Sequence, residues 1–164
     1  MTDSLAPPIS PTRRLRTVFG TFPSGVTALA AQLDGDPVGI AASSFTSVSL
    51  DPPLASVCVA ASSTTWPILS RAPYLGVSVL GEAHEDACRQ LAAKDGDRFA
   101  GLAWRVTGEG AILLEDASAW FVCRIEQCLV AGDHQIVVLG IHDYAGDPSI
   151  PPLVFHRGAF RRLR

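Results

Sequence analysis

The stretch AWFVCRIEQCLVAGDHQIVVLGIHDY, residues 119–144, decides the fold class. In its first half Phe121 and Ile125 fall on one face of an extended chain, whereas the charged Arg124 and Glu126 fall on the other. Such alternation is typical of an antiparallel strand with one buried face. Because a Gly-Asp turn separates this half from a second apolar run, the stretch predicts a long β-hairpin.

Further strands are predicted on both sides of this hairpin. Upstream, apolar and β-branched runs are separated by short turn signals, and downstream a last pair flanks Arg157 and Gly158. The predicted strands are GVTALAAQL, PVGIAASSFTSVSL, PLASVCVAA, YLGVSVL, the two halves of the hairpin, and the final pair PPLVFH and AFRRL. Consecutive strands joined by short turns favour an antiparallel barrel over a doubly wound parallel sheet.

Three short helices are predicted among the strands. Apolar residues recur at helical spacing after Thr12, which is placed to cap a first helix that ends near Pro23. The segment STTWPILSRA predicts a second helix, capped by Ser63 or Thr64. The segment EAHEDACRQLAAK has small and apolar residues four apart, which predicts a short amphipathic helix.

Length and composition limit the possible functions. The 164 residues fit one domain, predicted over residues 12–164 after a flexible N-terminal arm over residues 1–11. A net charge of -3 and the lack of a broad basic cluster argue against nucleic-acid binding. No apolar run approaches the roughly 20 residues of a membrane-spanning helix, so no membrane association is expected. The apolar content of 48% suggests that another subunit covers part of the surface.

Cysteine, histidine and glycine spacing removes several kinds of site from consideration. The four cysteines form no C-x-x-C pair and no zinc-like spacing with the four histidines, so no disulfide framework and no metal site is expected. Free thiols suit a reducing compartment, which predicts a cytoplasmic protein. The sequence has no G-x-S-x-G elbow, Rossmann fingerprint or P-loop, so any nucleotide is held by another kind of module.

Hydroxyl side chains gather in two segments. GIAASSFTSVSLDPPL, residues 39–54, is rich in serine, and SSTT, residues 62–65, begins the predicted second helix. Capping explains one or two of the SSTT hydroxyls, but all four beside free N–H groups predict a phosphate site. An exposed edge strand is the simple explanation of the first segment. However, Phe45, Val48 and Leu50 interrupt its alternation, which predicts packing on both faces and a flat slot for a heteroaromatic ligand.

These segments together resemble the flavin reductase family. FPSGVTALAA, GIAASSFTSVSLDPPL, SSTT, DRFAGLAW, AGDHQIVVLG and PLVFHRGAF occur in the family's order and at its spacing over nearly the whole chain after the arm. The resemblance implies a mainly β fold, an antiparallel six-stranded split β-barrel of the FMN-binding, Greek-key-like kind with a few short peripheral helices. It also implies an NAD(P)H:flavin oxidoreductase that forms a homodimer and supplies reduced flavin to a partner flavin-dependent monooxygenase.

The resemblance assigns roles to particular residues. The expected cofactors are FMN or FAD, with NADH or NADPH as hydride donor, and His134 is the predicted catalytic residue near the nicotinamide. The predicted cofactor-binding residues hold the flavin ring, its ribityl chain and its phosphate: Ala41, Ala42, Ser43, Ser44, Phe45, Thr46, Ser62, Ser63, Thr65, Ala92, Arg98 and Phe160. The chain departs from the family's usual residues at Ala41, Ser43, Ala61, Leu91 and Phe160.

Other functions remain open at this point. The departures remove hydroxyls and a charge, which favours a non-catalytic flavin-binding carrier or chaperone on the same scaffold. A split barrel for a deazaflavin or a haem is a further alternative, although the serine-rich slot does not favour it. A purely structural dimer module leaves the ordered match of six segments unexplained.

Overall fold

The computed structural model describes residues 10–163, so residues 1–9 of the predicted arm lie outside the described residues. Its helical segments are α1 (Pro11–Phe19), α2 (Trp66–Leu69), the 3-10 helix η1 (Glu82–His84) and α3 (Glu85–Leu91). All three predicted helices are present, but two details of the first were wrong. Ser10 caps α1 in place of Thr12, because its Oγ accepts a hydrogen bond from the Arg13 N–H (3.3 Å), and α1 ends at Phe19.

Strands make up most of the remaining chain. In chain order they are β1 (Ser24–Gly25), β2 (Thr27–Leu33), β3 (Asp36–Ala42), β4 (Thr46–Leu50), β5 (Pro53–Ala60), β6 (Leu75–Val79), β7 (Trp104–Val106), β8 (Ile112–Leu114), β9 (Ala119–Ala131), β10 (His134–Gly146), β11 (Val154–His156) and β12 (Ala159–Arg161). Every described pairing between them is antiparallel. The predictions of a mainly β, antiparallel fold and of the β9–β10 hairpin are confirmed.

The largest sheet has seven strands in the order β3-β2-β6-β9-β10-β5-β4, so the predicted count of six is wrong. The difference arises in PVGIAASSFTSVSL, which divides into β3 and β4. The Ser44 side chain hydrogen-bonds the backbone of Cys58 at the point of division, so the chain turns there and β4 pairs with β5.

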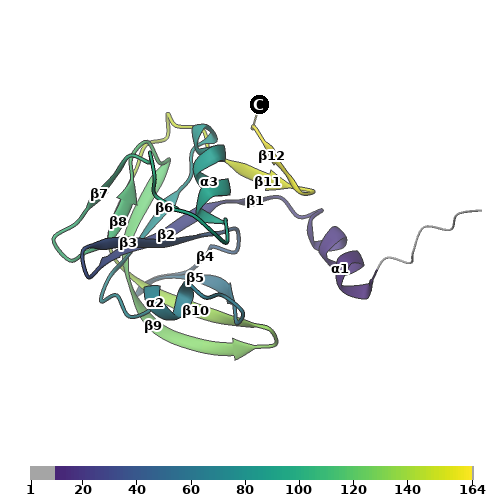
Figure 1. The fold of residues 1–164 in the computed structure, drawn as a ribbon, viewed down its shortest axis with the longest axis horizontal. Helices are drawn as coiled ribbons and strands as arrows, with labels where there is room; N and C mark the ends of the chain where they lie inside the picture. The colour runs from purple at the N-terminus through teal and green to yellow at the C-terminus, as the bar shows by residue number, and fades with distance from the viewer. Residues whose placement is uncertain (1–9, 164) are drawn as a thin grey trace, which may run out of the picture.

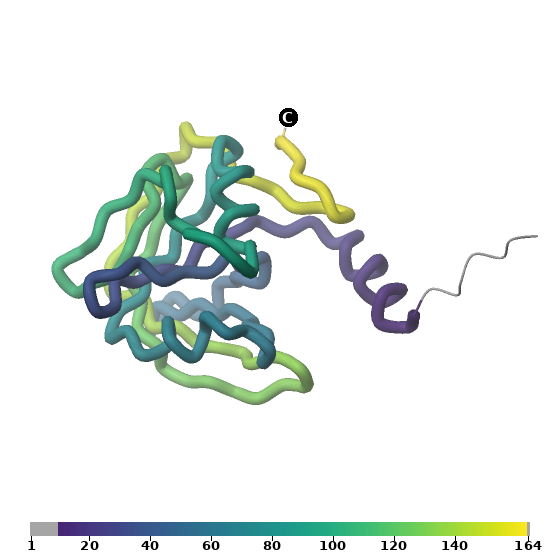
Figure 2. The backbone as a smooth tube through the Cα atoms, viewed as in Figure 1, coloured from purple at the N-terminus to yellow at the C-terminus, as the bar shows by residue number. Residues whose placement is uncertain are grey.

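The strand order also explains where the sheet opens. β3 and β4 form its two edges, yet only residues 43–45 separate them along the chain. The sheet must therefore curl until its edges approach each other, leaving a split beside this connection (Figures 1 and 2). A hairpin of β11 and β12 pairs with β1, and β7 pairs with β8, outside the main sheet.

The core lies on both faces of the curled sheet. On β2, Leu29 and Ala31 belong to a buried cluster inside the curl, whereas Ala28 and Ala30 belong to a second cluster with residues of α3 and β8. Small side chains on the outer face of β2 let these elements pack closely against it. The core thus fixes β3, the next strand along, between the barrel interior and α3.

Several apolar side chains are more exposed than the sequence predicts. Val48 and Leu50 were expected to pack into the barrel, but they are 52% and 93% exposed. They lie on the edge strand β4, which among residues 10–163 pairs only with β5. None of the residues of α1 is buried, although it carries Leu15, Val18 and Phe19. Within the described residues, these side chains leave apolar surface uncovered.

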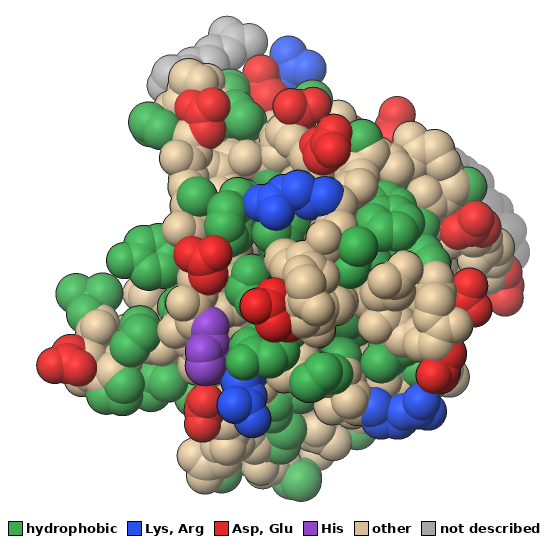
Figure 3. Space-filling view, turned by 90° about the vertical axis from the view of Figure 1, so that its left-hand side faces the viewer, with side chains coloured by type: hydrophobic (Ala, Val, Ile, Leu, Met, Phe, Trp, Pro, Cys, Tyr) green, Lys and Arg blue, Asp and Glu red, His purple; other side chains and the backbone are tan. Residues whose placement is uncertain are grey.

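The face turned away from α1 carries charges of both signs. Figure 3 shows acidic side chains spread between hydrophobic ones, with the Lys and Arg side chains on this face well separated. Such a surface lacks the concentrated positive charge of a nucleic-acid site. No helix among residues 10–163 is long and apolar enough to cross a membrane.

Candidate functional site

A cavity of about 400 Å³ lies at the split between the sheet edges. Of the predicted site residues, the structure brings eight together around it: Ala41, Ala42, Ser43, Ser44, Ser63, Ala92, Arg98 and His134. They come from the end of β3, the connection to β4, the approach to α2, the end of α3 and the start of β10. Cavities of this size and mixed lining are typical of small-molecule sites.

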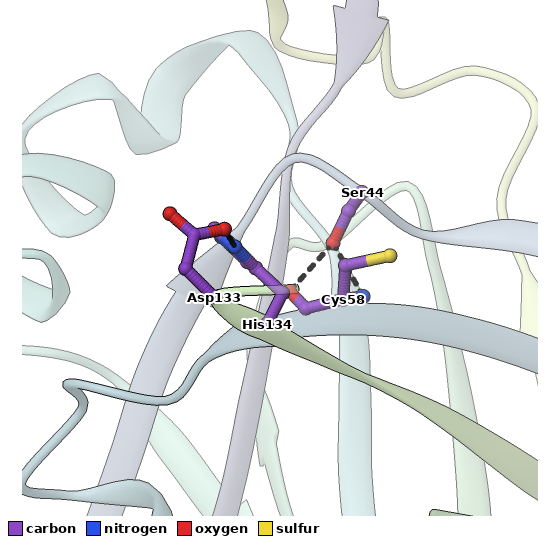
Figure 4. A network of polar contacts seen from close by, with 4 residues as sticks. All are labelled: Ser44, Cys58, Asp133 and His134. Atoms are coloured by element: carbon purple, nitrogen blue, oxygen red, sulfur yellow. Dashed lines mark hydrogen bonds and ion pairs between the residues drawn. The ribbon is translucent and has the colours of Figure 1, made fainter. Parts of the chain in front are cut away.

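Ser44 lines this cavity. Its hydroxyl donates to the Cys58 carbonyl (3.0 Å) and accepts from the Cys58 N–H (2.8 Å), as Figure 4 shows. The pairing of β4 with β5 ends at Thr46, which lies opposite Ser56. Beyond this point the Ser44 hydroxyl, and not a neighbouring strand, satisfies the backbone N–H and C=O of Cys58 on β5. The hydroxyl therefore fixes the path of residues 43–45 along the cavity wall.

Replacing Ser44 with alanine is expected to loosen this wall. Loss of the two hydrogen bonds should lower the free energy of unfolding by about 1 kcal/mol and weaken flavin binding roughly tenfold. Flavin fluorescence titration and thermal unfolding measure the two effects. Ser47→Ala, on the exposed part of β4, is the matched control and should change neither quantity. An unaltered flavin Kd in Ser44→Ala would show that this wall does not form the binding surface.

Ser63 and Arg98 supply polar groups at one part of the cavity. Ser63 Oγ accepts a hydrogen bond from the N–H of Trp66, the first residue of α2 (3.1 Å), but the N-cap residue is Thr65 and not the predicted Ser63 or Thr64. The Arg98 guanidinium is partly buried and donates to the Gly39 carbonyl (3.0 Å), which places it beside β3. Because the remaining N–H groups of this guanidinium have no other partner among the described residues, they suit a phosphate.

His134 stands at the tip of the β9–β10 hairpin and lines the same cavity. The hairpin register places it beside Ala60, and the Ala61 N–H donates to the Asp133 carbonyl (2.9 Å), which ties the tip to β5. His134 Nδ1 lies 2.7 Å from Asp133 Oδ1 (Figure 4). This hydrogen bond lowers the pKa of the Asp133 carboxyl below its ordinary value. With Nδ1 engaged, Nε2 is the ring nitrogen left for a ligand.

Five predicted residues lie outside this cavity. Phe45 stacks on Phe121 (ring centroids 5.5 Å apart) and packs against the core. Thr46 and Ser62 are exposed and do not line the cavity. Thr65 lines a neighbouring cavity that also includes Arg98, and Phe160 lines another that shares Ala41, Ala42 and Ser43.

The structure adds residues that the sequence did not indicate. Ile40, Cys58, Val59 and Ala60 also line the cavity, beside Leu91, where the sequence departs from the family's usual residue. Cys58 and Ala60 lie there because β5 pairs with β10 in the register that sets Ala60 opposite His134. Only the pairing of these two strands could have identified them, since neither belongs to a hydroxyl cluster.

The four thiols are all free, but they differ in exposure. Cys58 and Cys128 are exposed, whereas Cys88 and Cys123 are buried. Burial raises the pKa of Cys88, and it raises the pKa of Cys123 to about 12. The two buried thiols therefore stay protonated at neutral pH and act as core residues.

Comparison with known proteins supports one class of function. Residues 19–164 match the model of a family described as "Flavin reductase like domain". The chain is 38% identical to a flavin reductase from Pseudomonas putida, over 88% of this chain and 86% of that protein. It is 35% identical to the reductase subunit of a flavin-dependent monooxygenase from Rhodococcus jostii, over 90% of this chain and 76% of that protein.

A solved structure agrees in both fold and sequence. An NADH:FAD oxidoreductase from Streptomyces globisporus, solved with NAD and FAD fragments, superposes with a TM-score of 0.88 at 36% identity. The match covers 97% of this chain and 98% of that one.

These relatives, together with the mainly β antiparallel fold, place the chain among the flavin-linked oxidoreductases. The chain belongs to the flavin reductase family, which residues 19–164 match. The sequence-based predictions of the family, of an oxidoreductase and of flavin and nicotinamide cofactors are confirmed at this level.

Proposed function

We propose that the cavity at the split binds FMN or FAD and that the chain reduces this flavin with NADH or NADPH. The observation that carries the proposal is the convergence of Ser43, Ser44, Ser63, Arg98 and His134 on one cavity with an apolar floor. A bound flavin would supply the ring that accepts a hydride, which explains why the site needs no acid–base pair.

The lining of the cavity fits the parts of a flavin. Ile40, Val59 and the alanines of β3 offer flat apolar surface for a ring, and the serine hydroxyls offer partners for a ribityl chain. Arg98 and Ser63 offer a cation and a hydroxyl for a phosphate. His134 would contact the nicotinamide from the hairpin side. These roles are supported by position and chemistry.

Mixing the purified protein with flavin and NADH or NADPH tests this function. Steady loss of the nicotinamide absorbance that depends on both protein and added flavin is the expected result. A carrier or chaperone would bind the flavin without increasing this loss, so flavin binding without NAD(P)H oxidation would favour that alternative. The absorption spectrum of the purified protein would then show whether flavin stays bound.

We further propose a homodimer. Support comes from the exposed apolar side chains at the N-terminal side of the fold: Leu15 is 53% exposed, Phe19 68% and Phe22 78%. Exposed large apolar side chains that are close in the chain are typical of subunit interfaces. A flavin-dependent monooxygenase is proposed as the partner that uses the reduced flavin. The four free thiols support a cytoplasmic location.

Changing Leu15 and Phe19 together to aspartate is expected to produce monomers. Burying two carboxylates in an apolar interface is unfavourable by several kcal/mol, which exceeds what an interface of ordinary size tolerates. Light scattering after size exclusion measures the mass of each species. Val106→Asp, which changes an exposed apolar residue on β7, should leave the dimer intact. A wild-type chain that elutes as a monomer would contradict the proposal.

A further inference from the structure

A second cavity, of about 530 Å³, lies between α1 and the β11–β12 hairpin. Three arginines from two separate elements line it: Arg13 and Arg16 of α1, and Arg157 at the hairpin turn. Thr17 and Gly158 complete much of the wall. The site described above does not include any of these residues.

The two faces of α1 differ in chemistry. Arg13, Arg16 and Thr17 are three or four residues apart, or adjacent around the helix, so they share the face that lines the cavity. The apolar Leu15 and Phe19 fall on other sides of α1 and do not line it. The basic face is thus separate from the apolar surface proposed for the dimer.

Hydrogen bonds hold the two walls of this cavity together. The Arg157 N–H donates to the Gly20 carbonyl (2.8 Å), and His156 Nε2 lies 3.2 Å from the Thr21 carbonyl oxygen. Arg157 (φ 52°) and Gly158 (φ 75°) form a two-residue turn in which both residues have positive φ. Such turns favour Asn, Asp or Gly at the first position, so an arginine there is unfavourable for the backbone. The turn geometry therefore does not explain an arginine at position 157, whereas a role for its guanidinium in the cavity does.

The positive charge of this cavity is not balanced by carboxylates within residues 10–163. The arginines that form ion pairs there are Arg71, Arg89 and Arg162, not those of the cavity. Arg16 makes a small contribution to the lowered pKa of Asp133, behind the larger effect of His134. Arg16 thus lies within electrostatic range of the hairpin tip that carries His134. Three cations around one cavity repel each other and suit a ligand with several negative charges.

A third cavity, of about 360 Å³, connects this region to the flavin cavity. It shares Ala41, Ala42, Ser43 and Ala92 with the flavin cavity and Gly158 with the arginine cavity, and Phe155 and Phe160 line it. Ser63 and Arg98, the residues proposed for the flavin phosphate, line neither the third cavity nor the arginine cavity. The arginines therefore lie on a different side of the flavin cavity from its phosphate end.

We propose that the arginine cavity binds the phosphate groups of the nicotinamide dinucleotide. A dinucleotide carries its phosphates at a distance from its nicotinamide, so it can reach His134 with one end and the arginines with its phosphates. Guanidinium groups bind phosphates through two parallel hydrogen bonds, which gives both charge and geometry. This inference rests on the proposed function, because it assumes that a nicotinamide dinucleotide is the hydride donor.

Removing the three charges tests the proposal. The variants are Arg13→Gln, Arg16→Gln and Arg157→Asn, singly and combined; asparagine tolerates positive φ at the turn. The KM for NADH and NADPH should rise roughly threefold for each single change and about 30-fold for the triple, with kcat and flavin Kd little changed. Raising the ionic strength should increase the KM of the wild type more than that of the triple variant.

Arg14→Gln is the matched control, because Arg14 lies on the same helix but does not line the cavity. It should leave KM unchanged. An unaltered KM in the triple variant, or a weaker flavin affinity with unaltered KM, would overturn the proposal. Calorimetry with NAD⁺ on the flavin-loaded protein provides a readout that needs no turnover: the triple variant should bind at least about tenfold more weakly. If the wild type oxidises no NAD(P)H but binds NAD⁺ in an arginine-dependent way, the proposed function fails and this inference stands.

Discussion

Replacing His134 with alanine is expected to lower kcat/KM for NADH oxidation by roughly 100-fold, while flavin Kd changes less than about threefold. His134 is one of the few polar side chains on the hairpin side of the cavity, and its Nδ1 is held by Asp133 at 2.7 Å. The ring is therefore oriented before any ligand arrives. Its loss should affect the placing of the nicotinamide, whereas the flavin contacts of β3 and Ser44 stay in place.

Two further histidine-related variants make this experiment specific. His142→Ala is the matched control, because His142 belongs to the same strand but contacts Tyr74 away from the cavity. Asp133→Asn should lower kcat/KM for NADH oxidation less, by roughly fivefold, because the imidazole ring of His134 remains but is held less firmly. Equal losses of turnover and of flavin affinity in His134→Ala would assign His134 to flavin binding and contradict the proposed role.

The secondary structure that could be predicted was encoded locally. The alternation of Phe121, Arg124, Ile125 and Glu126 predicted β9, and the Gly-Asp turn predicted its hairpin with β10. The division of residues 37–50 into two strands could not be read in this way. It depends on the hydroxyl of Ser44 and the backbone of Cys58, which are fourteen residues apart in the chain.

The candidate site was predictable to the extent that its residues form recognisable segments. Ser43, Ser44 and His134 belong to such segments, and the structure brings them to one cavity. Cys58 and Ala60 were missed because their position depends on the register between β5 and β10. The arginine cavity was missed for a similar reason: hydrogen bonds join α1 to a turn more than a hundred residues later.

Replacing Gly76 with alanine is expected to destabilise the fold by about 3 to 4 kcal/mol and to lower Tm by roughly 10 °C. A Cβ on Gly76 would lie 1.8 Å from the Ile112 carbonyl oxygen of β8. The clash is with backbone, so no side-chain rotation can relieve it. β8 cannot move away cheaply, because the Leu114 N–H donates to the buried Ser78 Oγ (2.9 Å) and Ile112, Leu113 and Leu114 are buried.

Thermal unfolding of Gly76→Ala and of Gly108→Ala separates this clash from the general effect of adding a methyl group. A Cβ on Gly108 would meet nothing within 4 Å, so Tm should change by less than about 2 °C. Because no residue of β6 or β8 lines the flavin cavity, the folded fraction of Gly76→Ala should bind flavin with unchanged Kd at low temperature. A Tm equal to that of the wild type would mean that the backbone of β8 does not lie against Gly76 of β6. An altered flavin Kd would mean instead that the packing of β8 on β6 changes the shape of the flavin cavity. The cavity would then depend on the packing of both faces of the sheet.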